Sequence, residues 1–316
     1  TALDFVTVWK RRVWAIEKNT FRAWYLATDA VTGAATSFDF KAIFQRGGYL
    51  VALLTWTIDG GTGIDDLFVA VSSEGEAAVY QGTDPAAAAT FSLRGLFFIG
   101  RPVGRRFFAK FGGDVFVLTS SGLRPMSEFL QSNVVTSILT DRIQRQIVLD
   151  VATYGATVGW ELLTYLDDDL LIVQVPSGAV GTRSQYVMNV LTGAWSKTTI
   201  APVITFATHN GQLYAGHSNK VANSWTGGLD NTASITYRMT PAFSYFGSPT
   251  QGKHFLLGRA TMEADVNPAF MAKLLTNFNT AANFPSQVAN PVTGAVWDTA
   301  KWDAEIWGGS TAFYRK

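Results

Sequence analysis

Residues 65–85 read DDLFVAVSSEGEAAVYQGTDP, and this stretch indicates how the chain folds. DLFVAV is an apolar run rich in strand-forming residues, SSEGE is a turn sequence, and AAVYQG is a second apolar run. Two short apolar runs joined by a few polar residues and a glycine predict a β-hairpin. The adjacent carboxylates Asp65 and Asp66 also raise the question of an acid pair with a chemical role.

The same layout returns four more times along the chain. The equivalent residues of the five units are Val13, Leu67, Val115, Leu170 and Leu213. Subtraction of these numbers gives intervals of 54, 48, 55 and 43 residues. Repeats of about 40 to 50 residues with several short strands each are typical of β-propeller blades. Because one blade cannot bury both faces of its sheet, blades must stack around an axis. We therefore expect a mainly β protein, with a β-propeller over residues 1–230.

Two segments depart from this pattern. Residues 127–152 place apolar side chains at mixed helical spacing after Ser127, a candidate helix cap, and predict a helical insertion. This insertion either clips the propeller rim or forms an oligomer contact, and the sequence leaves both alternatives open. Residues 231–316 contain longer alternating runs that predict a β-rich, sandwich-like C-terminal domain. We expect this domain to be truncated, because the chain stops soon after its last strand-like run.

The composition excludes several classes of protein. Lys and Arg (25) nearly balance Asp and Glu (24), so the net charge of +1 gives no global attraction to nucleic acid or membrane surfaces. The absence of cysteine removes disulfides, thiolate metal sites and cysteine nucleophiles. The longest apolar run, residues 48–58, is too short to span a bilayer, and we expect no membrane-spanning segment.

The polar residues form no catalytic or metal-binding signature. Neighbouring residues of a strand point to opposite faces, so Asp65 and Asp66 alone cannot form the separated carboxyl pair of a glycosidase. Carboxylates recur just before later apolar runs, at Asp114 and Asp167–Asp169, as expected of solvated turns. The three histidines lack the further closely spaced ligands that zinc requires. We therefore predict no catalytic residues, no metal, no cofactor and no enzymatic activity.

Several stretches, in this order, resemble one protein family. They are VWAIEKNTFRAWYLATDAVTGAATSFDF (residues 13–40), the stretch at residues 65–85, IGRPVGRRFFAKFGGDVFVLTSSGLRPMS (residues 99–127) and WDTAKWDAEIWGG (residues 297–309). The chain resembles the tail nozzle proteins of short-tailed bacteriophages, also called packaged-DNA stabilisation or tail hub proteins.

The resemblance implies a structural protein of the virion tail that is made in the host cytoplasm. It implies a β-propeller that assembles into a ring, typically a hexamer, in contact with other tail, adaptor or portal proteins. The genomic DNA passes through the ring without sequence-specific binding, and the ring retains the packaged DNA until ejection. The chain is shorter than such proteins usually are. Two alternatives stay open: a carbohydrate-binding propeller that recognises a receptor on the host surface, and a propeller glycoside hydrolase.

One basic cluster, LRGLFFIGRPVGRRFFAK at residues 93–110, is the candidate interaction site. Its cations are Arg94, Arg101, Arg105, Arg106 and Lys110. The cations either form an exposed rim over a phenylalanine core, or bind acidic residues of a neighbouring subunit or ring, or contact DNA phosphates. We rank DNA last, because many ion pairs to DNA would slow its exit from the channel. We predict a subunit or ring contact.

Overall fold

The computed structural model describes most of the chain up to residue 227 and short stretches after it. The described residues are 2–59, 64–87, 89–131, 138–176, 183–198, 203–227, 229–230, 233–234, 238–240, 243–254, 274–277 and 279. The chain divides into two compact units, Thr1–Ile235 and Thr236–Lys316. The predicted C-terminal domain, residues 231–316, lies mostly outside the described residues, so its β-rich structure and its boundary stay predictions.

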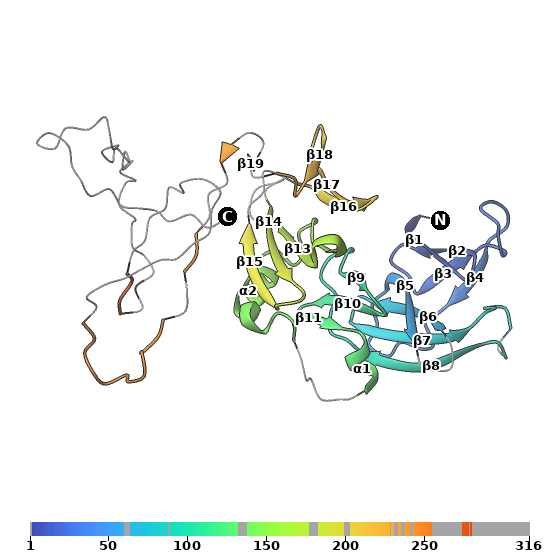
Figure 1. Ribbon diagram of the computed structural model, residues 1–316. Helices are drawn as coiled ribbons and strands as arrows, with labels where there is room; N and C mark the ends of the chain where they lie inside the picture. Colours follow the sequence, from blue (N-terminus) through green and yellow to red (C-terminus); the bar gives the residue numbers. More distant parts are fainter. Residues whose placement is uncertain are drawn as a thin grey trace, which may run out of the picture. The chain divides into compact units, whose positions relative to one another are not determined.

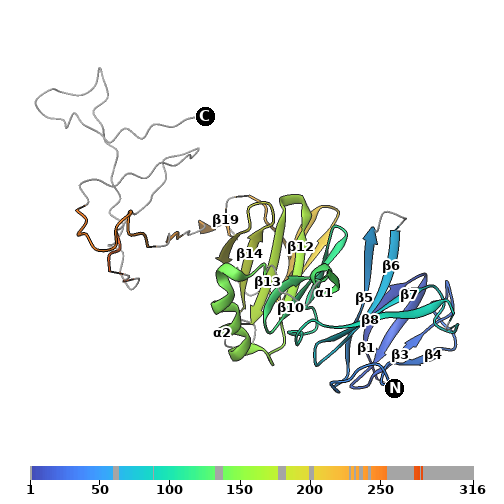
Figure 2. The same ribbon diagram turned by 90° about the horizontal axis from the view of Figure 1, so that it is seen from below.

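The first unit is mainly β, as predicted, and consists of antiparallel sheets that follow one another along the chain (Figures 1 and 2). Sheet A contains β1 (Leu3–Trp9), β2 (Arg12–Glu17), β3 (Arg22–Tyr25) and β4 (Thr36–Asp39). Sheet B contains β5 (Leu50–Asp59), β6 (Ile64–Ser72), β7 (Glu76–Gly82) and β8 (Phe91–Phe98). Sheet C contains β9 (Phe108–Phe111), β10 (Asp114–Thr119) and β11 (Gly122–Pro125).

The later sheets continue the same order. Sheet D contains β12 (Glu161–Tyr165), β13 (Leu170–Pro176), β14 (Arg183–Asn189) and β15 (Ala194–Thr198). Sheet E contains β16 (Thr205–His209), β17 (Gln212–Gly216) and β18 (Val221–Ser224). A two-stranded pair, β19 (Leu229–Asp230) and β20 (Ala233–Ser234), follows sheet E.

The repeat seen in the sequence corresponds to these sheets. Each of the five aligned residues lies in the second strand of its sheet, that is in β2, β6, β10, β13 or β17. The hairpin predicted from residues 65–85 is confirmed, with β6 paired to β7. The sequence also predicts that Asp65 and Asp66 lie in a turn just before the strand, and this detail was wrong, because β6 already begins at Ile64 and pairs with β5 along its whole length.

Helices separate sheets C and D within the segment predicted to be helical. They are α1 (Ser127–Gln131), the 3-10 helix η1 (Asp141–Ile143) and α2 (Gln144–Tyr154). Ser127 is the first residue of α1 and not its cap. Asp114 takes that role, because its carboxylate accepts two hydrogen bonds from Ser127. The backbone N–H of Ser127 donates at 3.2 Å and the Ser127 hydroxyl donates at 2.5 Å.

Helix α2 packs on the sheets of its own chain. Ile147 is buried in the core between sheets B, C and D, and Tyr186 of β14 donates a hydrogen bond to Asp150 at 2.7 Å. Burial and this bond to Asp150 raise the pKa of the Tyr186 phenol. These contacts favour the first alternative for the insertion, a helix that packs on the sheets and holds them together. Val148 and Leu149 on α2 remain exposed, so an oligomer contact through this helix stays a prediction.

The hydrophobic cores lie between consecutive sheets. Leu53 and Phe68 of sheet B pack in a core with sheet A, whereas Leu54 and Val69 of the same strands pack in the core shared with sheets C and D. Sheet D is likewise buried on both faces, since Leu171 and Ile172 enter different cores. Burial on both faces explains why β5 and β13 read as almost continuous apolar runs.

Neighbouring sheets contact one another in chain order, in most cases through their first strands. Strand β1 contacts β5, β5 contacts β10 of sheet C, β9 contacts β12, and β12 contacts β16. An isolated bridge between Arg106 and Glu161 is parallel, so the chain enters β9 and β12 in the same direction. The beginnings of several first strands are therefore gathered at one place in the first unit.

Candidate functional site

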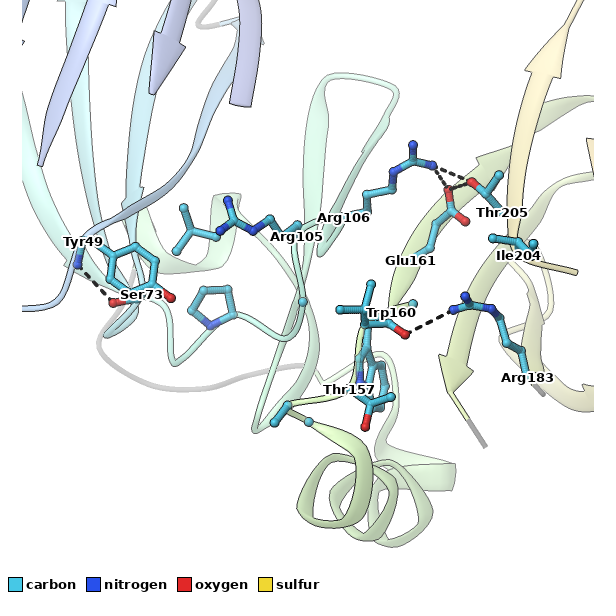
Figure 3. Close-up of a pocket in the computed structure, with 17 residues that line it drawn as sticks. Tyr49, Ser73, Arg105, Arg106, Thr157, Trp160, Glu161, Arg183, Ile204 and Thr205 are labelled. Carbon is cyan, nitrogen blue, oxygen red and sulfur yellow. Dashed lines mark hydrogen bonds and ion pairs between the residues drawn. The ribbon is translucent and has the colours of Figure 1, made fainter. Parts of the chain in front are cut away.

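A cavity of about 710 Å³ opens where these first strands begin (Figure 3). Sheet B contributes Tyr49 and Val51, and the segment that enters β9 contributes Arg105 and Arg106. The beginnings of β12 and β16, and the turn 155–159 after α2, complete the wall. We call this space the strand-start cavity. Its volume is in the range of cavities that bind small ligands, about 300 to 1,000 Å³.

Glu161 is the most connected side chain of the cavity wall. It is only 5 % exposed, and its carboxylate accepts hydrogen bonds from Arg106 Nη1 at 2.6 Å, from the Thr205 hydroxyl at 3.0 Å and from the Phe206 backbone N–H at 3.1 Å. Figure 3 shows the Arg106, Glu161 and Thr205 side chains converging. A single buried carboxylate thus links the entrance to sheet C with sheets D and E, because Glu161 of β12 accepts one hydrogen bond from Arg106 and two from the start of β16.

The predicted interaction residues are largely occupied within the chain. Arg105 forms an ion pair with Asp4 of β1, and Arg101 pairs with Glu74 of the turn between β6 and β7 at 2.6 Å. Lys110 of β9 donates a hydrogen bond to Thr55 of β5. Together with the bonds of Arg106 to Glu161 and Thr205, the cluster connects sheet C and the segment before it to sheets A, B, D and E.

Arg94 is the exception in this cluster. It lies exposed on β8, and no carboxylate partner is found for it among the described residues. The structure thus adds intramolecular roles for four of the five cations. A contact of the cluster with a neighbouring subunit stays a prediction.

The carboxylates singled out in the sequence have separate structural tasks. Asp66 accepts the Thr57 hydroxyl at 2.9 Å and pairs with Lys10 of the loop after β1. The hydrogen bond from Thr57 lowers the pKa of the Asp66 carboxyl against a smaller opposing effect of burial, and Lys10 lowers it further. Asp167 and Asp168 belong to the 3-10 helix η2 (Leu166–Asp168), and Asp169 follows in the left-handed region at φ 52°, so this run does form a turn.

The cavity does not bring two carboxylates together. Glu161 is the only carboxylate among the residues that line it, and it is engaged by Arg106. A glycosidase requires two carboxyl groups across the scissile bond. Within the described part of the chain, no three His, Asp and Glu side chains gather as metal ligands would. Nor does any helix of that part have the length and apolar character needed to cross a membrane.

Sequence reasoning missed Arg183, Asp4 and Glu74 as members of this network. No local signal marks them, because each interacts with a segment far away along the chain. The partners Arg101 and Glu74 are 27 residues apart, and Arg106 and Thr205 are 99 residues apart.

Comparisons with known proteins give distant structural likenesses. No protein-family model matches the chain, and no curated protein matches it. The WD40 domain of SCAP from fission yeast is similar at a TM-score of 0.34 and 14 % identity, over 67 % of this chain and 52 % of that one. A complex of the fission yeast SREBP-SCAP binding domains is similar at a TM-score of 0.37 and 14 % identity, over 77 % of this chain and 68 % of that one. An exported protein from Bacteroides fragilis is similar at a TM-score of 0.25 and 9 % identity, over 63 % of this chain and 77 % of that one.

Proposed function

We propose that this chain is a structural protein of a short-tailed bacteriophage tail, with a β-propeller that forms part of the nozzle ring. The observation that carries the proposal is the arrangement of the first unit, in which consecutive sheets share hydrophobic cores and contact one another in chain order, mostly through their first strands. This is the arrangement expected of propeller blades around an axis. The resemblance of the sequence to tail nozzle proteins supplies the biological context.

A nozzle must be stiff, and the contacts between sheets favour stiffness. Sheets B and D are buried on both faces, and aromatic rings fill the core between sheets A and B. In that core Trp14 lies 4.6 Å from Phe68, and Tyr80 stacks on Phe91 at the same distance between ring centroids. Interiors packed in this way resist deformation. The ion pairs of Arg105 and Arg106 add links across the sheets at their strand starts.

Assembly into a ring requires surfaces that a neighbouring subunit can cover. Strand β1 is at the edge of sheet A, and its Val6 and Val8 are 61 % and 60 % exposed. Exposed apolar residues on an edge strand favour association with another chain. In the proposed ring this face contacts the next subunit, and the exposed Arg94 is available for an acidic partner.

Electron microscopy and mass photometry of the purified full-length protein test the proposal. We expect closed rings, and we expect the double variant Val6→Asp, Val8→Asp to shift the population toward monomers. Val31→Asp is the matched control, because Val31 is also exposed, at 82 %, but lies in a loop. A protein that stays monomeric at all concentrations and binds no tail component contradicts the proposed function.

A further inference from the structure

Arg183 differs from the other charged residues of the strand-start cavity. The charged side chains in the wall are Arg105, Arg106, Arg183 and Glu161. Arg105 and Arg106 each have a carboxylate partner. Arg183 has none among the described residues, and the neighbouring residues 177–182 read SGAVGT, which contains no acid.

The Arg183 guanidinium is only partly satisfied by hydrogen bonds. Its Nη1 donates a long hydrogen bond of 3.5 Å to the carbonyl of Val158, and its Nε is buried without a hydrogen-bond partner. Figure 3 shows the side chain directed toward Trp160 and the loop before it. A guanidinium carries five N–H donors, so most of its hydrogen-bonding capacity is left for a further group.

The loop opposite is shaped to receive this side chain. Gly159 has φ +126°, a conformation that L side chains rarely adopt, and a Cβ at this position would lie 1.3 Å from Arg183 Nη1. Only glycine therefore lets the guanidinium lie against the loop. The glycine at 159 and the buried Nε thus hold Arg183 against the loop, while the residue as a whole is half-buried.

We propose that the strand-start cavity binds a ligand with a single carboxylate group, which pairs with the guanidinium of Arg183. Among the described residues, and counting Asp4, three arginines face two carboxylates, so their net charge is +1 and the charge without a carboxylate partner is that of Arg183. A planar carboxylate matches the guanidinium fork with two parallel hydrogen bonds. A dianionic phosphate would bring an uncompensated negative charge near Glu161 and is disfavoured.

The surroundings of Arg183 define the rest of the ligand. Val158 and Ile204 of the cavity wall are 90 % and 40 % exposed, and Pro102 lies in the same wall. These apolar groups suit a short hydrocarbon chain attached to the carboxylate. Such a group belongs either to a small organic acid or to a glutamate side chain of a peptide. This inference goes beyond the proposed nozzle function and does not depend on ring formation.

Isothermal titration of the full-length protein in a low-salt chloride buffer tests the inference. The probes are butyrate for a free organic acid, N-acetylglutamate amide for a peptide side chain, and inorganic phosphate. We expect at least one of the two carboxylates to bind saturably at one site per chain and more tightly than phosphate. Tight binding of the glutamate probe alone identifies a peptide, and tight binding of butyrate alone identifies a small acid.

Variants of Arg183 assign the binding to the cavity. We expect Arg183→Gln to weaken binding roughly tenfold to a hundredfold, and Arg183→Lys to weaken it because the planar fork is lost. Arg145→Gln, an exposed arginine on α2 outside the cavity, is the control and keeps the affinity. Circular dichroism verifies that each variant is folded. If Arg183→Gln does not fold, the affinity of Arg183→Lys provides the test. No saturable carboxylate binding, tighter binding of phosphate, or equal affinity in folded Arg183 variants overturns the inference.

Discussion

Replacement of Glu161 by glutamine tests whether a buried carboxylate holds the strand starts together. The substitution keeps the size of the side chain and removes its charge. The amide oxygen can still accept the buried N–H of Phe206, while the new NH₂ group faces Arg106 and Thr205. We expect a loss of about 2 kcal/mol in the free energy of unfolding, because a hydrogen bond to a charged group contributes about 1.5–3 kcal/mol. For a unit of this size, that corresponds to a fall in Tm of about 4–8 °C.

The same reasoning predicts a smaller effect for the opposite partner. The side chain of Arg106 is 63 % exposed, so in Arg106→Gln the remaining contacts of Glu161 persist and water replaces the guanidinium. We expect a loss of at most about 1 kcal/mol, in line with exposed ion pairs, and a reduction of that loss in high salt.

Urea unfolding followed by circular dichroism measures both variants. An unchanged dependence of the free energy on urea concentration shows that the unfolded state is comparable in the two proteins. The reasoning predicts a larger loss in the free energy of unfolding for Glu161→Gln than for Arg106→Gln. Equal losses, or a Glu161→Gln protein as stable as the parent, would refute the view that the buried carboxylate and its bond to the Phe206 N–H stabilise the strand starts.

Three further predictions concern stability. Burial raises the pKa of Tyr80 to about 12, above the unfolded value near 10, so its contribution to stability is complete below pH 10 and is lost as the pH rises toward 12. In urea unfolding over a pH series, Tyr80→Phe should therefore leave the alkaline loss unchanged up to pH 10 and reduce it by about 2 to 3 kcal/mol by pH 12, and identical pH profiles of the two proteins would contradict this. Asp150→Ala leaves the Tyr186 hydroxyl without its acceptor, and we expect a loss of about 1–3 kcal/mol with faster hydrogen exchange in α2, whereas unchanged exchange would contradict the docking role of Asp150. Gly82→Ala places a Cβ 1.7 Å from the backbone oxygen of Thr90 at φ +137° and should lower the free energy of unfolding by about 2–4 kcal/mol. Gly33→Ala is the control, because Gly33 has φ +121° but no atom within 4 Å of the added Cβ, and its loss should be clearly smaller. Equal falls in Tm for the two variants would argue against the steric clash.

Much of the strand arrangement was predictable from the sequence, for local reasons. Alternation, glycine-containing turns and apolar runs are properties of neighbouring residues, so aligning Val13 with Leu67 and their three equivalents located the second strand of each of sheets A to E. The apolar residues at 50–54 and 56 likewise reflect burial on both faces of sheet B. The helical segment after residue 127 was also visible, although its cap, Asp114, lies in a different element.

The candidate site could not be predicted in the same way. The strand-start cavity exists because segments far apart in the sequence are stacked next to one another, and the partners Asp4 and Glu161 are assigned to Arg105 and Arg106 only by that stacking. A free cation and a paired cation look identical in a sequence. Short-range periodicity in the sequence therefore located the second strand of each of the five repeated units and the number of these units, since both depend on neighbouring residues. Only the fold shows that Arg105 and Arg106 are neutralised and that Arg183 has no carboxylate partner among the described residues, because the pairing of charges depends on distances in space.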